Sequence, residues 1–315
     1  LPELPDDAAA LAELAALRAQ TYDNETAADL HHAATDIVFE LMFADPRREG
    51  LRAAVLDWQA ELAGQVFGAA SPERAEALMV LSDSLLVELS DSVAALAPAE
   101  AAVALLRANP DELAPLAEHL LTALANVHRG LGQPAPAVPL RREALAILQA
   151  DPTTHARALS GRGIDLAIDL AASGTADDAE AEALLRGAVA TMQAAVEPGD
   201  HQLADARINL GAFLTARGRG TEAAAALEPA RQVAQARIAE FDWDTARVIP
   251  QLSTLARIEI AAGNPDAANA VFLQIATQLQ AVAADAPEDA RDLARGVLDD
   301  LRWRRIDHPA AAAHG

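Results

Sequence analysis

Two adjacent histidines, His31 and His32, lie beside Asp29 and Asp36 and have the residue types of metal ligands. His32 and Asp36 are four residues apart, so their side chains share one face of a helix. A metal site would need two or three further ligands from facing elements, and none is evident from the pattern. A helix surface with local ion pairs explains these residues better. We therefore expect no metal site and no cofactor.

A second candidate for chemistry is the glycine turn Gly218-Arg219-Gly220, within INLGAFLTARGRGTEAAAALEPAR. A phosphate-binding P-loop requires a lysine, and the sequence contains none. A dinucleotide-binding fingerprint requires a third glycine and a preceding strand, whereas GRGTEA has two glycines and follows a predicted helix. The turn is better explained as the corner of a helical hairpin.

Motifs for other reactions are missing from the sequence. It contains no cysteine, no H-E-x-x-H and no G-x-S-x-G, so thiol chemistry and the zinc-protease and serine-hydrolase motifs are excluded. The remaining histidines are dispersed, and acidic residues are too frequent for any two to be paired from sequence. We therefore expect a protein without catalytic activity.

The composition favours helices and an acidic surface. Hydrophobic residues make up 52% and aromatics 3%, and alanine, the best helix former, dominates. The formal net charge of −23 argues against nucleic-acid and anionic-membrane partners, which both require clustered positive charge. A solvated acidic surface explains this charge, and a basic partner is the alternative. Because LPELPDDAAALAEL has no signal-peptide pattern, a cytoplasmic location is the default expectation.

Four glycines that follow apolar helical segments indicate an internal repeat. Gly132, Gly174, Gly218 and Gly263 recur every 42 to 45 residues (132 to 174, 174 to 218, 218 to 263). Each is predicted to be the left-handed residue that ends the first helix of a hairpin. We infer that these residues punctuate a series of helix–turn–helix units.

Small residues lie at regular distances from these glycines on both helices of each unit. The second helices carry small residues seven positions apart, such as Ala223 and Ala230, which lie nearly on one face. The first helices carry a leucine followed by a small residue, which is Gly211 in the best-preserved unit and alanine in the others (Ala125, Ala167, Ala256). These positions would let the two helices approach closely.

The pattern resembles the tetratricopeptide repeat. The long period and the linker VEPGDHQLADARINLGAFL are similar to the kinesin-light-chain type of that family, in which Asn-Leu-small follows an Asp-His linker. The resemblance extends from about Glu112 to Leu279. One departure is Arg141, which stands where a large apolar residue is expected. The resemblance implies an all-α solenoid.

We expect three segments. Residues 1–111 are degenerate hairpins or an N-terminal helical cap, with Pro98 near the start of a second helix. Residues 112–286 form about four repeats, and residues 287–315 form a C-terminal capping helix and tail.

In solenoids of this type, as the resemblance implies, the first helix of each unit lines a concave groove that holds a peptide or a partner helix. Asparagine suits hydrogen bonding to a peptide backbone, and arginine can bind a carboxylate. The candidate groove residues on these helices are His119, Asn126, Arg129, Ile208, Asn209 and Arg257.

A protein- or peptide-binding scaffold is the favoured function. The alternative is a regulatory sensor that binds a signalling peptide or a small molecule and acts on a separate effector. An enzyme built on a helical-repeat scaffold is a third and less favoured possibility.

Overall fold

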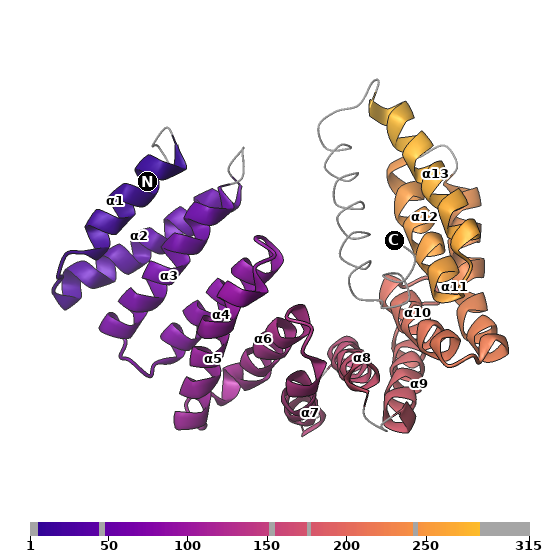
Figure 1. The fold of residues 1–315 in the computed structure, drawn as a ribbon, viewed down its shortest axis with the longest axis horizontal. Coiled ribbons are helices and arrows are strands. Elements are labelled where there is room, and N and C mark those ends of the chain that lie inside the picture. Colours follow the sequence, from indigo (N-terminus) through magenta and orange to yellow (C-terminus); the bar gives the residue numbers. More distant parts are fainter. Residues whose placement is uncertain (1–5, 44–47, 151–154, 175–177, 242–244, 284–315) are drawn as a thin grey trace. The chain divides into compact units, whose positions relative to one another are not determined.

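The computed structural model describes residues 6–43, 48–150, 155–174, 178–241 and 245–283, and these residues form thirteen α-helices and one 3-10 helix (Figure 1). The described residues contain no strand, which confirms the predicted all-α class. The expected C-terminal cap, residues 287–315, lies outside them. The chain divides into two compact units, one of residues 1–153 with 172–174 and one of residues 154–171 with 175–315. Each unit is described by itself.

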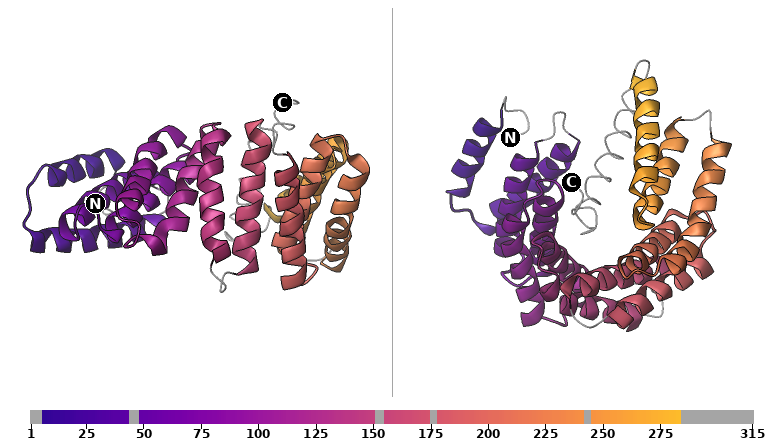
Figure 2. Two further views of the ribbon diagram at one scale, coloured as in Figure 1. Left: turned by 90° about the horizontal axis from the view of Figure 1, so that it is seen from below. Right: turned by 45° about the vertical axis from the view of Figure 1, so that its right-hand side comes forward.

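Unit 1 is a series of antiparallel helices in which neighbours along the chain pack together from α2 to α7 (Figure 2). Two further contacts skip one helix, α1 with α3 and α4 with α6. Unit 1 consists of α1 (Asp7–Arg18), α2 (Asn24–Met42), α3 (Glu49–Val66), α4 (Pro72–Val87), α5 (Ser92–Ala108), η1 (Ala114–Leu116), α6 (Ala117–Gly130) and α7 (Pro134–Ala150).

Unit 2 repeats this arrangement. From α9 to α13, each helix contacts the next, and α10 also contacts α12. The first helices of successive hairpins therefore lie side by side, as α4 and α6 do in unit 1. Unit 2 consists of most of α8 (Ala156–Ser173) together with α9 (Asp178–Ala195), α10 (His201–Ala216), α11 (Gly220–Glu240), α12 (Thr245–Ala261) and α13 (Pro265–Ala283).

Short polar residues fix where several helices begin. The Asp23 carboxylate accepts a hydrogen bond from the Thr26 amide at 2.8 Å, and Asp91 accepts one from Ala94 at 2.9 Å. Such caps satisfy amides that have no partner in the first helical turn. The Asp91 cap starts α5 at Ser92, so Pro98 lies inside this helix and not near its start as predicted. A proline there costs one backbone hydrogen bond, and the helix tolerates it.

The four repeat glycines are the left-handed residues that the sequence predicted. Their φ angles are 69° at Gly132, 68° at Gly174, 70° at Gly218 and 75° at Gly263. A side chain is strained at these angles, which explains why glycine occupies all four turns. Ser90, between α4 and α5, has a φ of 53° without being glycine. The α4–α5 corner therefore lacks the left-handed glycine that follows α6, α8, α10 and α12.

The small residues predicted to lie between the two helices of each hairpin are buried. Ala223 and Ala230 on α11 are 1% and 3% exposed, and Ala125, Ala167 and Ala256 are fully buried. A Cβ atom on Gly211 would lie 2.5 Å from the Leu227 Cγ atom, so this turn of α10 has no room for a side chain. The predicted helix register of the hairpins is confirmed.

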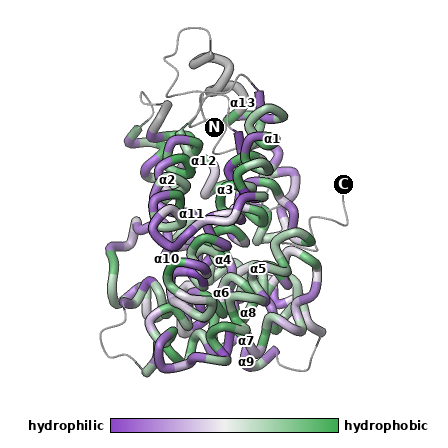
Figure 3. The backbone as a smooth tube through the Cα atoms, turned by 90° about the vertical axis from the view of Figure 1, so that its left-hand side faces the viewer, coloured by the Kyte–Doolittle hydropathy of each residue, from purple (hydrophilic) through white to green (hydrophobic). Residues whose placement is uncertain are grey.

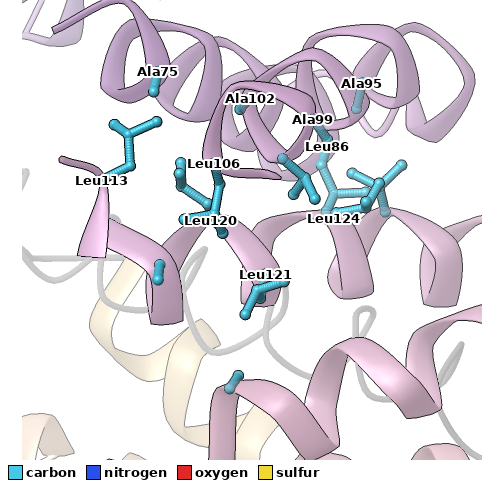
Figure 4. Close-up of a cluster of buried hydrophobic side chains, with 14 residues drawn as sticks. Ala75, Leu86, Ala95, Ala99, Ala102, Leu106, Leu113, Leu120, Leu121 and Leu124 are labelled. Carbon is cyan, nitrogen blue, oxygen red and sulfur yellow. The ribbon is translucent and has the colours of Figure 1, made fainter. Parts of the chain in front are cut away.

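Apolar residues from several successive helices build each core. In unit 1 one cluster joins α4, α5, α6, α7 and the residue before η1 through leucines and alanines, including Leu86, Ala99, Leu113, Leu120 and Leu124 (Figure 4). Polar and apolar segments alternate along the helices, as amphipathic packing requires (Figure 3). Arg141 departs from this pattern because it is a charged residue only 1% exposed within α7.

Candidate binding surface

The first helices of two hairpins in unit 2 bring polar side chains together. We call Asp205, Asn209 and Arg257 the α10/α12 polar surface. The Arg257 Nη2 atom lies 2.6 Å from the Asp205 Oδ1 atom, and this ion pair links α12 to α10. The Arg257 side chain is 11% exposed, so its apolar stem is buried while its charge is balanced by Asp205.

Asn209 is held in place by its own helix. Its Nδ2 group donates to the Asp205 backbone oxygen at 2.9 Å, one turn earlier on α10. Within the described residues, no group donates to the Asn209 Oδ1 atom, and the side chain is half-buried. The amide is therefore oriented and keeps an acceptor for a ligand.

Ile208 does not belong to an open surface, contrary to the sequence prediction. It is 4% exposed and packs in a cluster with Leu227, Ala230, Ile258 and Ala261. Both α11 and α12 pack against this side of α10, which removes Ile208 from solvent. Stepping along the helix by three or four residues does not show how much of α10 the next hairpin covers.

In unit 1, the first helices α4 and α6 also bring polar groups together. We call Asp83, Glu118, His119 and Thr122 the α4/α6 polar surface. Thr122 Oγ1 donates to Glu118 Oε1 at 3.1 Å, and His119 Nδ1 lies 3.4 Å from Glu118 Oε2. Glu118 is 7% exposed, whereas the His119 side chain is 63% exposed. The predicted residue His119 is therefore accessible and lies beside a buried carboxylate.

Asp83 and Glu118 were not among the residues predicted from the sequence. A usable signal was present for Glu118, because a glutamate four residues before a threonine on one helix face can accept the threonine hydroxyl. Asp83 had no such local signal. It approaches His119 only because α4 packs against α6.

Burial raises the pKa of the Asp83 carboxyl, and the nearby His119 imidazole opposes this shift. A carboxyl whose pKa is higher in the folded state holds its proton more tightly there than in the unfolded chain. Its contribution to stability is therefore greatest at low pH and declines as the pH rises above the unfolded value of about 3.9.

The Asp83→Asn variant should lack this decline. We expect its thermal midpoint to exceed that of the wild type at pH 7, with the difference shrinking as the pH falls toward 4. Thermal unfolding followed by circular dichroism between pH 4 and pH 7 measures the effect. A difference that is constant across this range would show that Asp83 ionisation does not limit stability.

The other two predicted groove residues lie on α6. Asn126 is half-buried, and its Oδ1 atom accepts a hydrogen bond of 2.7 Å from Nη2 of the buried Arg141 on α7. This contact makes Asn126 part of the packing between α6 and α7. Arg129 is half-buried in the last turn of α6, where a positive charge complements the helix dipole.

The histidine pair at the start of the chain lies on α2. The His31 ring makes an edge-to-face contact with Phe67, with 5.3 Å between ring centroids, and burial lowers the His31 pKa. Across the described ranges, no group of three or more histidine, aspartate or glutamate side chains is placed to hold a metal ion. None of the helices in the described part of the chain is long and apolar enough to cross a membrane.

Comparisons with known proteins bear on the fold. No family model matches the chain, and no curated protein matches it. Two crystal structures of nearly identical tetratricopeptide-like repeats, from a protein described as a kinesin light chain of Podosopora anserina, are similar to it. One is 22% identical over 68% of this chain and 98% of that chain, with a TM-score of 0.52. The other is 20% identical over 69% and 99%, with a TM-score of 0.51.

At such identities the likeness shows the fold alone, and the geometry of the repeats agrees with that fold. The repeat glycines adopt left-handed angles, and the small residues between the paired helices are buried. The chain therefore has the fold of a tetratricopeptide-like repeat solenoid.

Proposed function

We propose that this protein is a scaffold that binds a peptide or partner helix along the first helices of its hairpins. The fold supports an interaction role in general, because stacked hairpins form an extended pre-formed surface. The observation that carries the more specific proposal is the α10/α12 polar surface. There, Asn209 is oriented by Asp205 and keeps a free acceptor next to the Asp205–Arg257 ion pair.

The chemistry of this surface suits a polypeptide ligand. A fixed amide oxygen can accept a hydrogen bond from a backbone N–H of the ligand, which gives affinity with little sequence preference. The Asp205–Arg257 pair offers a donor and an acceptor at the same place. Because these groups are already oriented, binding orders few side chains, and the entropic cost of association is small.

Replacing Asn209 and Arg257 together with alanine tests the assignment. Peptides selected from a random display library on the wild-type protein provide the probes, and fluorescence anisotropy measures their dissociation constants. We expect the double variant to bind at least about tenfold more weakly, because hot-spot truncations cost more than about 1 kcal/mol. Circular dichroism should show unchanged helicity.

A matched control removes the same kinds of groups from the second helices. Gln232 on α11 and Arg186 on α9 are exposed, and their joint replacement with alanine should leave peptide binding unchanged. Equal affinity of the selected peptides for the wild type and the Asn209/Arg257 double variant would contradict the assigned surface. A selection that yields no binding peptide would contradict peptide binding itself.

A further inference from the structure

Unit 2 contains an open polar pocket of about 790 Å³ apart from the α10/α12 polar surface. It lies where the loop between α9 and α10 meets the end of α11 and the early part of α12. Its lining includes Arg157, Glu197, Gly199, Asp200, Arg237 and Gln251. We call it the Arg237 pocket.

Two of the charged groups around this pocket, Arg157 and Asp200, already have partners within the fold. The Arg157 Nη2 atom lies 2.6 Å from Asp200 Oδ2, and its Nη1 group donates to Gln202 Oε1 at 2.8 Å. Asp200 also caps α10 by accepting a hydrogen bond from the Gln202 amide at 2.9 Å. The charges of Arg157 and Asp200 therefore balance each other, and both side chains make contacts that stabilise the fold.

Arg237 is different. Its side chain is half-buried, yet it makes no hydrogen bond or ion pair with any residue in the described part of the chain. Its guanidinium lies against Gly199, because a Cβ atom there would come within 2.2 Å of the Arg237 Nη2 atom. The glycine thus leaves the space that the guanidinium occupies. The result is a positioned cation in a pocket with its hydrogen-bond donors unused.

The rest of the lining indicates which anion fits. Glu197 contributes a carboxylate to the same pocket, and this carboxylate makes no hydrogen bond or ion pair with any of the described residues. Its negative charge disfavours a doubly charged anion such as phosphate through like-charge repulsion. A single carboxylate matches the planar guanidinium, which can donate two parallel hydrogen bonds to it.

We propose that the Arg237 pocket binds the carboxylate of a peptide chain, from either its C-terminus or an acidic side chain. Arg237 supplies the paired donors, and Gly199 positions the guanidinium by leaving it room. Gln251, on the α12 side, offers an amide to the neighbouring peptide group. This site is separate from the α10/α12 polar surface, and neither binding event requires the other.

NMR titration of the full chain with small probes tests the proposal. The probes are N-acetyl-trialanine with a free C-terminus, N-acetyl-Ala-Glu-Ala amide, and N-acetyl-trialanine amide, together with inorganic phosphate. We expect saturable shifts of the Gly199 amide and the Arg237 Nε–H signal with one or both carboxylate probes. The amide probe should have no effect, and phosphate should bind more weakly than the carboxylate. The stronger of the two carboxylate probes identifies the source.

Three variants assign the effect. Arg237→Gln should weaken carboxylate binding at least about tenfold, since it removes the charged guanidinium that donates two parallel hydrogen bonds. Gly199→Ala should also weaken carboxylate binding, because the new Cβ atom displaces the Arg237 guanidinium. The midpoint of thermal unfolding of this variant should stay the same as in the wild type. Arg186→Gln removes the same charge from outside the pocket and should change nothing. Equal binding of the amide probe, stronger binding of phosphate, or unchanged binding by Arg237→Gln would each overturn the proposal.

Discussion

Replacing Gly211 with leucine should destabilise the protein by about 1–3 kcal/mol, the usual cost of overpacking a well-packed core. A Cβ atom at this position would lie 2.5 Å from Leu227 Cγ and 2.6 Å from its Cδ2 atom, and Leu227 is fully buried. Leu227 has no open space to move into, so α10 and α11 must separate. Urea unfolding followed by circular dichroism measures the change in unfolding free energy.

The chain supplies a matched control for this substitution. Gly187 also lies inside a helix of unit 2, but a Cβ atom there would meet nothing within 4 Å. Gly187→Leu should leave stability unchanged or raise it by up to about 1 kcal/mol, because glycine is a poor helix former. If both leucine variants unfold at the same urea concentration, the close approach of α10 and α11 is wrong.

A compensating change sharpens the result. Leu227→Ala alone should cost about 2–5 kcal/mol, because it leaves a cavity opposite Gly211. In the double variant the new leucine fills that cavity, so its cost should be smaller than the sum of the two single costs. Strict additivity would show that residues 211 and 227 do not share one packing site.

Replacing Asn126 with alanine should cost about 1–3 kcal/mol of stability, although the sequence pattern places this residue among ligand contacts. Its Oδ1 atom accepts a 2.7 Å hydrogen bond from Nη2 of Arg141, which is 1% exposed. Removing an acceptor from a buried charged donor leaves a desolvated group that water cannot reach. Urea unfolding of Asn126→Ala measures this cost.

Two further variants separate the structural role of Asn126 from a general effect of asparagine. Asn126→Asp keeps an acceptor beside the guanidinium and should be at least as stable as the wild type, because the hydrogen bond becomes charge-assisted. Asn209→Ala breaks only a bond within its own helix and should change stability by less than about 0.5 kcal/mol. Equal losses for Asn126→Ala and Asn209→Ala would contradict the assigned role of the Arg141 contact.

Local rules determined much of the fold from sequence alone. A glycine that ends a helix is tied to its own left-handed φ angle, so the corners at Gly132, Gly174, Gly218 and Gly263 could be predicted without any knowledge of the neighbours. The seven-residue spacing of small residues depends on the geometry of one helix, so their shared buried face could also be predicted. The left-handed residue at the α4–α5 corner could not be predicted in this way, because Ser90 occupies a position where glycine is usual.

Contacts between helices decided what the candidate site contains. The sequence placed Ile208, Asn209 and Arg257 on first helices, which is where they are, but it could not show how far α12 would cover α10. That covering buries Ile208 and pairs Arg257 with Asp205, while Asn209 keeps a free acceptor. Periodicity reports the face of a single helix, and these outcomes depend on the second helix that packs against it.

Arg141 and Arg237 also show which features the sequence predicts and which depend on packing between helices. The sequence marked Arg141 as out of place in an apolar position, and only the packing of α6 against α7 supplied its acceptor on Asn126. Nothing in the sequence set Arg237 apart from the other arginines. Its lack of a partner and its contact with Gly199 arise from the meeting of α11 with the α9–α10 loop.

The sequence by itself determined the helices, the turns between them and the small residues where paired helices meet, because these depend on residues close along the chain. The tertiary structure alone decided which polar groups are paired and which remain available to a ligand, because their partners come from helices distant in sequence.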